Sequence, residues 1–364
     1  MSCDFFSLAT SGVSALSPYV PGKPEDELKR ELGLAQITKL ASNENPLGPS
    51  KKALNAIAHA SSALCRYPDG SGFVLRSALA KRLDVSANQI TLGNGSNDVL
   101  ELIVRAFCDE RSEVLFSQYA FAVYPLVTQA VGATSVVAPA VQWGHDLEAM
   151  SALISDKTKV VFIANPNNPT GTYVNTDTVV RFLDSVPANV LVVLDEAYCE
   201  YIDLADFPDG VALLAKYPNL IVTRTFSKAW GLAGLRVGYS VSHPDVANIL
   251  NRVRQPFNVN ALALAAATIV LEDDDYLEAS VKTNNKGMRQ IVDGFESLGL
   301  EYIPSVGNFI CVKVGDAAGV YQKLLRSGVI VRPVANYGMP EHLRVSIGLK
   351  EENSRFLDAL KAIL

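Results

Sequence analysis

The chain has 364 residues, of which 49% are hydrophobic and 19% are charged, and this composition is typical of a compact globular protein with one or two cores. The 32 Lys and Arg residues against 38 Asp and Glu give a net charge of −6, so the chain lacks the positive field that attracts nucleic acid or an anionic membrane. It also lacks an apolar run of the roughly 18 residues that span a bilayer, and its start, MSCDFFSLAT, is acidic where a signal peptide is basic, so we expect a cytoplasmic protein.

Between about residues 50 and 250, helical patterns alternate with short apolar runs. This alternation predicts an α/β domain built on a mostly parallel sheet. The runs VVFIA and VLVVL are apolar at every position, as expected of central strands that are covered on both faces. The predicted helices include 72–83 and 99–107, and the predicted strands are 89–92, 114–116, 135–137, 160–164, 190–194, 220–223 and 237–241.

After about residue 250 the pattern changes. A long helical stretch, residues 261–298, precedes the strand-like segments NFICVKV, VIVRPV and LRVSIG, with a further helix near residues 317–327. We expect a large domain of residues 45–255 and a smaller α+β domain of residues 1–44 and 256–364. Ligands of such sheets bind beyond the carboxyl ends of the strands, so the polar residues that follow each apolar run are the candidates for function.

Two of these strand ends carry loops suited to ligand binding. The segment from Gly93 to Asp98 joins a strand to a helix, and the free N–H groups of that helix start, with the side chains of Ser96 and Asn97, predict a seat for an anion such as phosphate. The third glycine of a dinucleotide fingerprint is absent, which argues against a nicotinamide dehydrogenase. The segment 165–171 is a turn rich in amides, which either serves the topology alone or lines a ligand.

Two charged residues follow later strands. Asp195 stands at the tip of the apolar strand 190–194, where an unpaired carboxylate is costly, so it needs a partner. Lys228 lies among small hydroxyl residues, ahead of a glycine-rich apolar stretch and eight residues before Arg236. Burial and a nearby cation both lower the pKa of a lysine, and they favour the neutral amine that forms a Schiff base.

Together these segments provide what pyridoxal 5'-phosphate needs, which is a Schiff-base lysine, a carboxylate for the pyridine nitrogen, donors to the ring oxygen and a phosphate cup. At this point the sequence resembles, over essentially its full length, the fold-type-I pyridoxal-phosphate aminotransferases, and among them the histidinol-phosphate aminotransferase family. This resemblance implies a large domain with a mostly parallel central sheet and a smaller α+β domain. The matching motifs are NENPLGP at 43–49, RYP at 66–68, NPNNPTG at 165–171, DEAY at 195–198, TFSK at 225–228, LR at 235–236 and LRVSIG at 343–348.

The resemblance also implies roles for the residues around the cofactor. Lys228 would form the Schiff base and then move the proton as general base and acid. Asp195 would pair with the pyridine nitrogen, while Asn168 and Tyr198 would hydrogen-bond the ring oxygen. The phosphate would be held by Ser96, Asn97, Thr225, Ser227 and Arg236.

Two aromatic positions complete the implied cofactor site. The family places a tyrosine over the pyridine ring, and counting back from Gly132 aligns Phe121 with it, although Tyr119 or Tyr124 remains an alternative. Tyr67 matches the residue that reaches the phosphate of the neighbouring subunit's cofactor. The resemblance therefore implies a homodimer.

The same resemblance names the substrate-binding residues. Arg344 matches the arginine that receives the carboxylate of the amino donor, a task suited to a planar fork of donors. Arg332 and Tyr19 match positions that contact the distal phosphate of histidinol phosphate, and Asn43 and Asn168 belong to the same substrate-binding group.

No metal site is predicted. The four histidines lie outside the motifs and lack the spacing of metal ligands, so we expect them to be structural or exposed. The five cysteines form no CxxC pair, and we expect buried, reduced thiols with neither a disulfide framework nor a zinc site.

The implied reaction is the transfer of an amino group from histidinol phosphate to 2-oxoglutarate, giving imidazole-acetol phosphate and glutamate in histidine biosynthesis. An aromatic aminotransferase acting on phenylalanine or tyrosine stays open, because Phe121 and the segment 334–338 suit a phenyl ring as well. A decarboxylase of a phosphorylated amino acid would need only a different orientation of the substrate. A non-catalytic cofactor-binding module conflicts with an intact Lys228, and the chain leaves no room for a DNA-binding extension.

Overall fold

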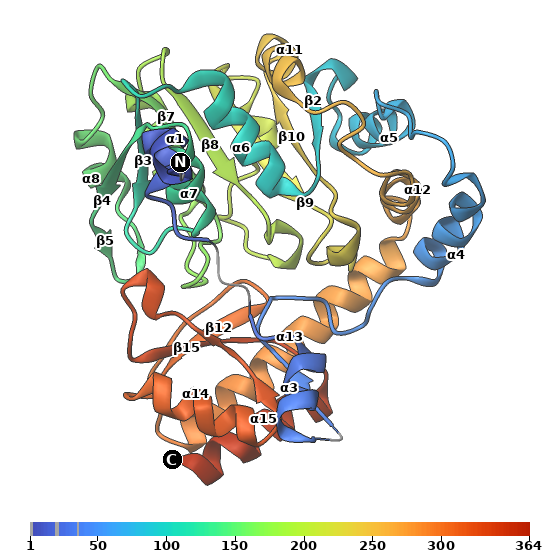
Figure 1. Cartoon of the computed structure of the whole chain (residues 1–364), viewed down its shortest axis with the longest axis vertical. Coiled ribbons are helices and arrows are strands. Elements are labelled where there is room, and N and C mark those ends of the chain that lie inside the picture. Colours follow the sequence, from blue (N-terminus) through green and yellow to red (C-terminus); the bar gives the residue numbers. More distant parts are fainter. Residues whose placement is uncertain (1–2, 19–21, 35) are drawn as a thin grey trace.

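A seven-stranded sheet lies at the centre of the larger domain in the computed structural model, which describes residues 3–18, 22–34 and 36–364 (Figure 1). The strand order is β2-β10-β9-β8-β7-β3-β4, and every strand is parallel to the others except β10, which runs antiparallel to both neighbours. The predicted parallel sheet is confirmed, and each predicted strand end is within two residues of the observed one. The strands are β2 (Ile90–Gly93), β3 (Glu113–Ser117), β4 (Thr134–Ala138), β7 (Thr158–Ala164), β8 (Leu191–Asp195), β9 (Leu220–Thr225) and β10 (Gly238–Ser242).

Helices cover both faces of this sheet, which explains why its central strands are apolar at every position. Val160 and Phe162 of β7 pack with α6 (Ser96–Phe107), α7 (Val123–Ala130) and α11 (Pro244–Val253), while Val161 and Ile163 pack with α8 (Leu147–Ala152) and α9 (Thr176–Ser185). Side chains alternate between the faces of a strand, so both sets must be apolar. A third core joins β2 and β10 to α4 (Lys51–Ala60), α5 (Phe73–Leu83) and α12 (Ala261–Val270). Short elements on the same domain are β5 (Ala140–Val141), β6 (Gly144–His145) and α10 (Gly210–Leu213).

The smaller domain is built on a four-stranded antiparallel sheet in the order β11-β12-β15-β14. Helices α13 (Asp274–Ser297), α14 (Ala317–Arg326) and α15 (Lys350–Ile363) close its core around Phe295 and Phe356. Its strands are β11 (Tyr302–Ile303), β12 (Phe309–Lys313), β14 (Arg332–Pro333) and β15 (His342–Ser346), and β1 (Thr38–Lys39) pairs in parallel with β13 (Val329–Ile330) beside them.

The stretch 261–298, expected as one helix, is two. Helix α12 ends at Val270 and packs on the large domain, whereas α13 begins at Asp274 and runs across to the small domain (Figure 1). Asp274 and Asp275 lie in the first turn of α13, where negative charge stabilises the positive end of the helix dipole. The acidic run at the break therefore marks a helix start that periodicity alone does not reveal.

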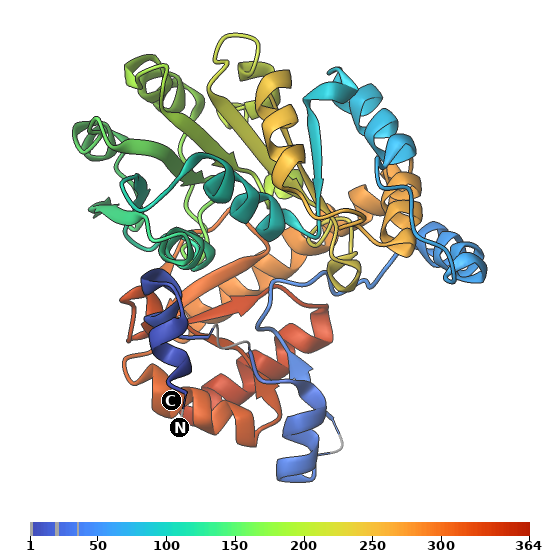
Figure 2. The same cartoon turned by 45° about the horizontal axis from the view of Figure 1, so that its top comes forward.

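The first residues of the chain contact both domains. Helix α2 (Ser11–Ser14) lies against α7, and Gly12 comes so close to the carbonyl oxygen of Gln129 that a Cβ would stand 2.1 Å from it. Helix α3 (Glu25–Leu32) instead packs through Leu28 on the small domain, while α1 (Phe5–Leu8) precedes α2 (Figure 2). The domain boundaries given above remain a prediction.

The cysteines differ in their burial. The expectation of buried thiols is wrong for Cys3 and Cys65, which are exposed because they lie in irregular segments at the surface. Cys311 in β12 is buried as expected, and all five cysteines are free. Within the described ranges, no helix is both long enough and apolar enough to cross a lipid bilayer.

Candidate active site

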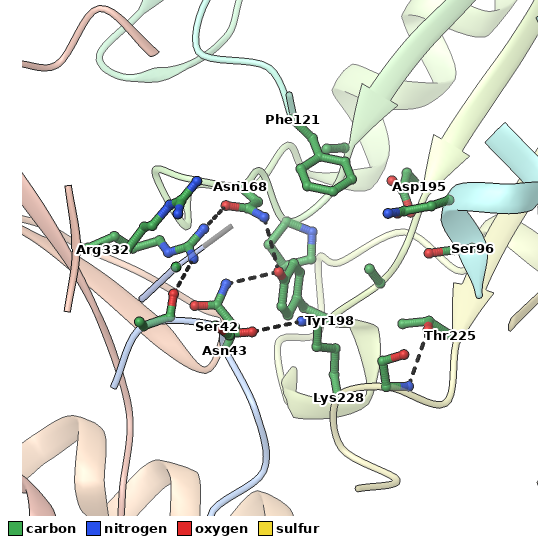
Figure 3. A pocket seen from close by; sticks show the side chains of 18 of the residues that line it. Ser42, Asn43, Ser96, Phe121, Asn168, Asp195, Tyr198, Thr225, Lys228 and Arg332 are labelled. Carbon is green, nitrogen blue, oxygen red and sulfur yellow. Dashed lines mark hydrogen bonds between the residues drawn. The ribbon is translucent and has the colours of Figure 1, made fainter. Parts of the chain in front are cut away.

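A cavity of about 190 Å³ lies at the carboxyl ends of β7, β8 and β9, where residues of both domains meet (Figure 3). In this view Phe121 lies above the cavity and Lys228 below it, with Ser96 and Thr225 at one end and Arg332 at the other. Tyr67 does not line this cavity, and Tyr19 falls outside the described residues. The lining includes all other residues predicted for the site, which are Asn43, Ser96, Asn97, Phe121, Asn168, Asp195, Tyr198, Thr225, Ser227, Lys228, Arg236, Arg332 and Arg344.

Lys228 is held in the loop after β9, with its amine inside the cavity. Its Nζ donates a hydrogen bond to the carbonyl oxygen of Ser42 at 3.2 Å. Burial, followed by the charge of Arg344 and more weakly that of Arg236, lowers the pKa of Lys228 to about 7. The predicted causes, burial and Arg236, are both present. A large fraction of this amine is therefore neutral, and nucleophilic, near neutral pH.

Asp195 ends β8 and is 4% exposed. Its Oδ1 accepts a hydrogen bond from Thr223 Oγ1 at 2.9 Å, and its Oδ2 accepts one from Tyr124 Oη at 2.8 Å. Burial raises the pKa of Asp195, whereas these two hydrogen bonds and the charge of Lys228 act in the opposite direction. The carboxylate is thus fixed from two sides while it still lines the cavity.

Of the three aromatic residues considered for stacking, only Phe121 lines the cavity. The ring of Tyr124 is fully buried and stacks on Phe162, with 4.4 Å between the ring centroids. Tyr119 packs against Trp143 at 5.2 Å. Of these three residues, Phe121 is accordingly the candidate for covering a planar ligand.

A hydrogen-bonded chain links the small domain to the centre of the cavity. Arg344 of β15 donates from Nη1 to Asn168 Oδ1 at 2.5 Å and from Nη2 to the carbonyl oxygen of Ala41 at 2.8 Å. Asn168 Nδ2 and Asn43 Nδ2 donate in turn to the hydroxyl oxygen of Tyr198, at 3.2 and 3.0 Å. Burial raises the pKa of Tyr198 to about 12, so its hydroxyl keeps its proton and can donate it to a ligand.

The other end of the cavity is built for an anion. Helix α6 starts at Ser96, and a Cβ added to Gly95 would lie 2.5 Å from Arg236 Nη2, so the guanidinium stands directly beside the helix start. Arg236 also donates to Ser227 Oγ at 3.4 Å and adopts a left-handed backbone with φ of 55°. Such a conformation costs about 1–3 kcal/mol in a non-glycine residue and is typical of functional positions. Free N–H groups, hydroxyls and a cation together fit a phosphate group.

Several residues at the site were missed by the sequence analysis. The carbonyl groups of Ala41 and Ser42 leave no trace in a sequence, because every residue carries one. Ser346 Oγ accepts from the backbone N–H of Asn43 at 2.8 Å and donates to Asn43 Oδ1 at 3.1 Å. Ser346 lies two residues after Arg344 on β15, so the two share a face of the strand, and this spacing was a usable signal.

Tyr67 lies apart from these residues. Its side chain is 83% exposed and stacks on Phe257 with 4.8 Å between the ring centroids. Leu64, Phe73 and Val74 are also exposed near it in the chain. An exposed aromatic group of this size at a surface with other apolar side chains is typical of a protein interface.

The site can be compared with those of known proteins. Residues 35–360 match the family model described as aminotransferase class I and II. The chain is 63% identical over 367 residues to histidinol-phosphate aminotransferase 2 of Pseudomonas fluorescens, covering 100% of this chain and 99% of that protein, and 62% identical to the protein of the same name from Pseudomonas aeruginosa, covering 99% of each. The crystal structure of histidinol-phosphate aminotransferase from Sinorhizobium meliloti in complex with pyridoxal-5'-phosphate superimposes with a TM-score of 0.90 at 31% identity, covering 97% of this chain and 96% of that one. The chain therefore belongs to the class I and II aminotransferase family.

Proposed function

We propose that the protein transfers the amino group of histidinol phosphate to 2-oxoglutarate with pyridoxal phosphate as cofactor, a step of histidine biosynthesis. The observation that carries this proposal is that one cavity joins the depressed-pKa amine of Lys228, the buried carboxylate of Asp195, an anion seat at α6 and two arginines from the small domain. The substrate in this proposal is taken from the relatives described above, since they carry the name histidinol-phosphate aminotransferase.

Each residue of the cofactor site is assigned a different role. Pyridoxal phosphate supplies an aldehyde for the lysine and a ring that accepts electrons from the substrate carbon. Lys228 would provide the amine for that aldehyde, and its Nζ would serve as the base and acid that moves a proton of the substrate. Asp195 would hold the ring nitrogen, and Tyr198 would hold the ring oxygen together with Asn168.

Phe121 would cover the ring, and the start of α6 would hold the phosphate. Five residues are assigned to that phosphate, and their position in the lining of the cavity supports the assignment. They are Ser96, Asn97, Thr225, Ser227 and Arg236.

The two arginines of the small domain are assigned to different substrates. Arg344 offers its planar guanidinium to the carboxylate of glutamate or 2-oxoglutarate. Arg332 lies at the end of the cavity away from Ser96 and serves the distal phosphate of histidinol phosphate (Figure 3). Tyr19 is assigned to the same phosphate from the resemblance alone, while Asn43 contacts substrate through the amide that also reaches Tyr198.

We further propose that the active unit is a homodimer in which Tyr67 reaches the cofactor phosphate of the partner subunit. Its exposure outside the cavity of its own chain supports this arrangement. Five free cysteines support a reducing compartment, and we assign the protein to the cytoplasm.

An aromatic aminotransferase is the second candidate. Phe121 and Tyr337 both line the cavity, and an aromatic wall that receives an imidazole ring also receives a phenyl ring. The substrates of this second candidate carry no phosphate group, so Arg332 would have no phosphate to bind.

Single half-reactions distinguish the two candidates. Protein loaded with pyridoxal phosphate would be mixed separately with L-histidinol phosphate, L-phenylalanine and L-glutamate, and the loss of the absorbance band of the lysine-bound cofactor would be followed. A much faster reaction with histidinol phosphate supports the proposal. An equal or faster reaction with phenylalanine assigns the protein to aromatic substrates, and no loss with any of them overturns the function.

A further inference from the structure

A tyrosine behind the cavity contacts the carboxylate proposed to bind the ring nitrogen. Tyr124 of α7 has no exposed surface, and its ring stacks on Phe162 of β7 at an interplanar angle of 5°. The surrounding core is apolar, with Phe116 and Phe162 among its members. A phenylalanine would fill the same space, and a buried hydroxyl is costly unless it is hydrogen-bonded. The partner of this hydroxyl is Asp195 Oδ2, at 2.8 Å.

The two donors to Asp195 fix its carboxylate group. Thr223 on β9 donates to Oδ1 and Tyr124 on α7 donates to Oδ2, so each oxygen is held by a different element. An ionised carboxylate has about four acceptor sites, and the remaining ones are open to a donor in the cavity. The charged and titratable groups that act on Asp195 and Tyr124 are Lys228, Tyr198 and Tyr337.

We propose that Tyr124 is a positioning residue of the cofactor site, whose hydroxyl keeps Asp195 ionised and oriented so that the ring nitrogen of pyridoxal phosphate stays protonated. This inference rests on the proposed role of Asp195. With the cofactor bound, the ring nitrogen and an oxygen of Asp195 would share one proton. A donor to the carboxylate stabilises its anionic form, and so leaves that proton on nitrogen. Without the donor, a buried carboxylate is more basic and draws the proton to itself.

Tyr124 remains a donor under all working conditions. Burial, and after it the charge of Asp195, raise the pKa of Tyr124 well above its usual value. Its hydroxyl therefore stays protonated, and its effect on Asp195 does not depend on pH.

The experiment compares Tyr124→Phe with a matched control, Tyr217→Phe. Tyr217 is also buried, and its hydroxyl also donates to a carboxylate, Asp184 Oδ1 at 2.7 Å, but neither residue lines the cavity. Each protein would be loaded with pyridoxal phosphate labelled with nitrogen-15 in the ring. The chemical shift of that nitrogen reports its protonation, and the dissociation constant of the cofactor is measured in parallel.

The expected result is that Tyr124→Phe moves the nitrogen resonance toward that of neutral pyridine. The dissociation constant should rise about tenfold, as for the loss of a hydrogen bond to a charged group. Tyr217→Phe should change neither value. A nitrogen resonance that is the same in Tyr124→Phe and the unaltered protein, while Asp195→Asn moves it, overturns the inference and leaves the role of Asp195 intact. A resonance that even Asp195→Asn does not move overturns the role of Asp195 itself.

A second variant covers the case in which Tyr124→Phe does not fold. A 3-fluorotyrosine incorporated at position 124 keeps the ring and makes the hydroxyl a stronger donor. It should move the nitrogen resonance further toward the protonated value. A shift toward neutral pyridine, or none, contradicts the inference.

Discussion

The ionisation of Lys228 is controlled by burial and by two neighbouring guanidinium groups, and this control is testable without any substrate. Because the pKa of Lys228 is lowered to about 7, its amine is protonated below that pH and neutral above it. Only the neutral amine attacks the cofactor aldehyde. The rate at which cofactor-free protein binds pyridoxal phosphate covalently should therefore rise through about pH 7 and then level off. Stopped-flow absorbance between acidic and alkaline pH measures this rate.

The cause of the lowered pKa can be tested in the same assay. Arg344→Gln removes the larger of the two cationic effects on Lys228, so the midpoint of the pH dependence should move to higher pH. Arg111→Gln is the control, because Arg111 is exposed and lies just before the amino end of β3. The cavity, in contrast, lies at the carboxyl ends of the strands. An unchanged midpoint in Arg344→Gln would show that the charge of Arg344 does not lower the pKa of Lys228.

The two arginines of the small domain should affect different substrates. Arg344→Gln should lower kcat/KM for glutamate about 100-fold or more, because it leaves a substrate carboxylate without its bidentate partner. Arg332→Gln should lower kcat/KM for histidinol phosphate about tenfold and affect glutamate less. Half-reaction kinetics with each donor give these values. Equal losses on both donors in both variants would refute the separation of roles.

At the residue scale, the sequence predicted side chains better than backbone groups. Lys228, Asp195 and Asn168 were predicted to lie together because strand ends converge at one edge of a parallel sheet, and all three line the cavity. The carbonyl oxygens of Ala41 and Ser42 could not be found in this way, although they bind Arg344 and Lys228. Tyr124 was considered for stacking on the cofactor, because spacing alone does not tell a residue in the cavity from one behind it.

At the scale of elements, the start of α6 depends on how closely β10 approaches it. A Cβ added to Gly238 of β10 would lie 2.4 Å from the backbone nitrogen of Ser96, which no side-chain movement can relieve. Gly238→Ala should therefore displace the helix start, raise the dissociation constant of pyridoxal phosphate at least tenfold and cost about 1–3 kcal/mol of stability.

The control for this variant is Gly234→Ala. A Cβ at Gly234 would have no atom within 4 Å, so the binding of the cofactor and the melting temperature should stay as they are. Cofactor titration and thermal unfolding of both variants check the prediction. Equal behaviour of the two variants would mean that the approach of β10 does not position the helix.

Local sequence patterns predicted the ends of an element only where the whole element has the same surroundings. Strand β7 is buried on both faces along its length, and its predicted and observed carboxyl ends agree at Ala164. The stretch 261–298 passes from one domain to the other, so its break depends on tertiary packing that periodicity does not report.

At the scale of the whole molecule, the two-domain architecture followed from the change of pattern near residue 250, whereas the path of the first residues did not. Helix α2 lies on the large domain and α3 on the small one, although both precede the first strand of the chain. Short helices with few buried residues carry little pattern from which to assign them to either core.

A mixed dimer can show whether Tyr67 acts in the site of its own subunit or in that of the partner. Lys228→Ala protein should be inactive, and Tyr67→Ala protein should bind the cofactor more weakly. In a mixed dimer with Tyr67 acting on the partner, one site carries both defects and the other carries none. In a mixed dimer with Tyr67 acting on its own subunit, each site carries one defect.

Mixing the two variants under conditions that exchange subunits separates these cases. Half of randomly re-formed dimers are mixed, so one intact site in each predicts about a quarter of the normal turnover at limiting cofactor. Turnover that stays at the average of the two separate variants would place Tyr67 in its own site. The exposed position of Tyr67 beside Phe257, outside the cavity of its own chain, leads us to expect recovery.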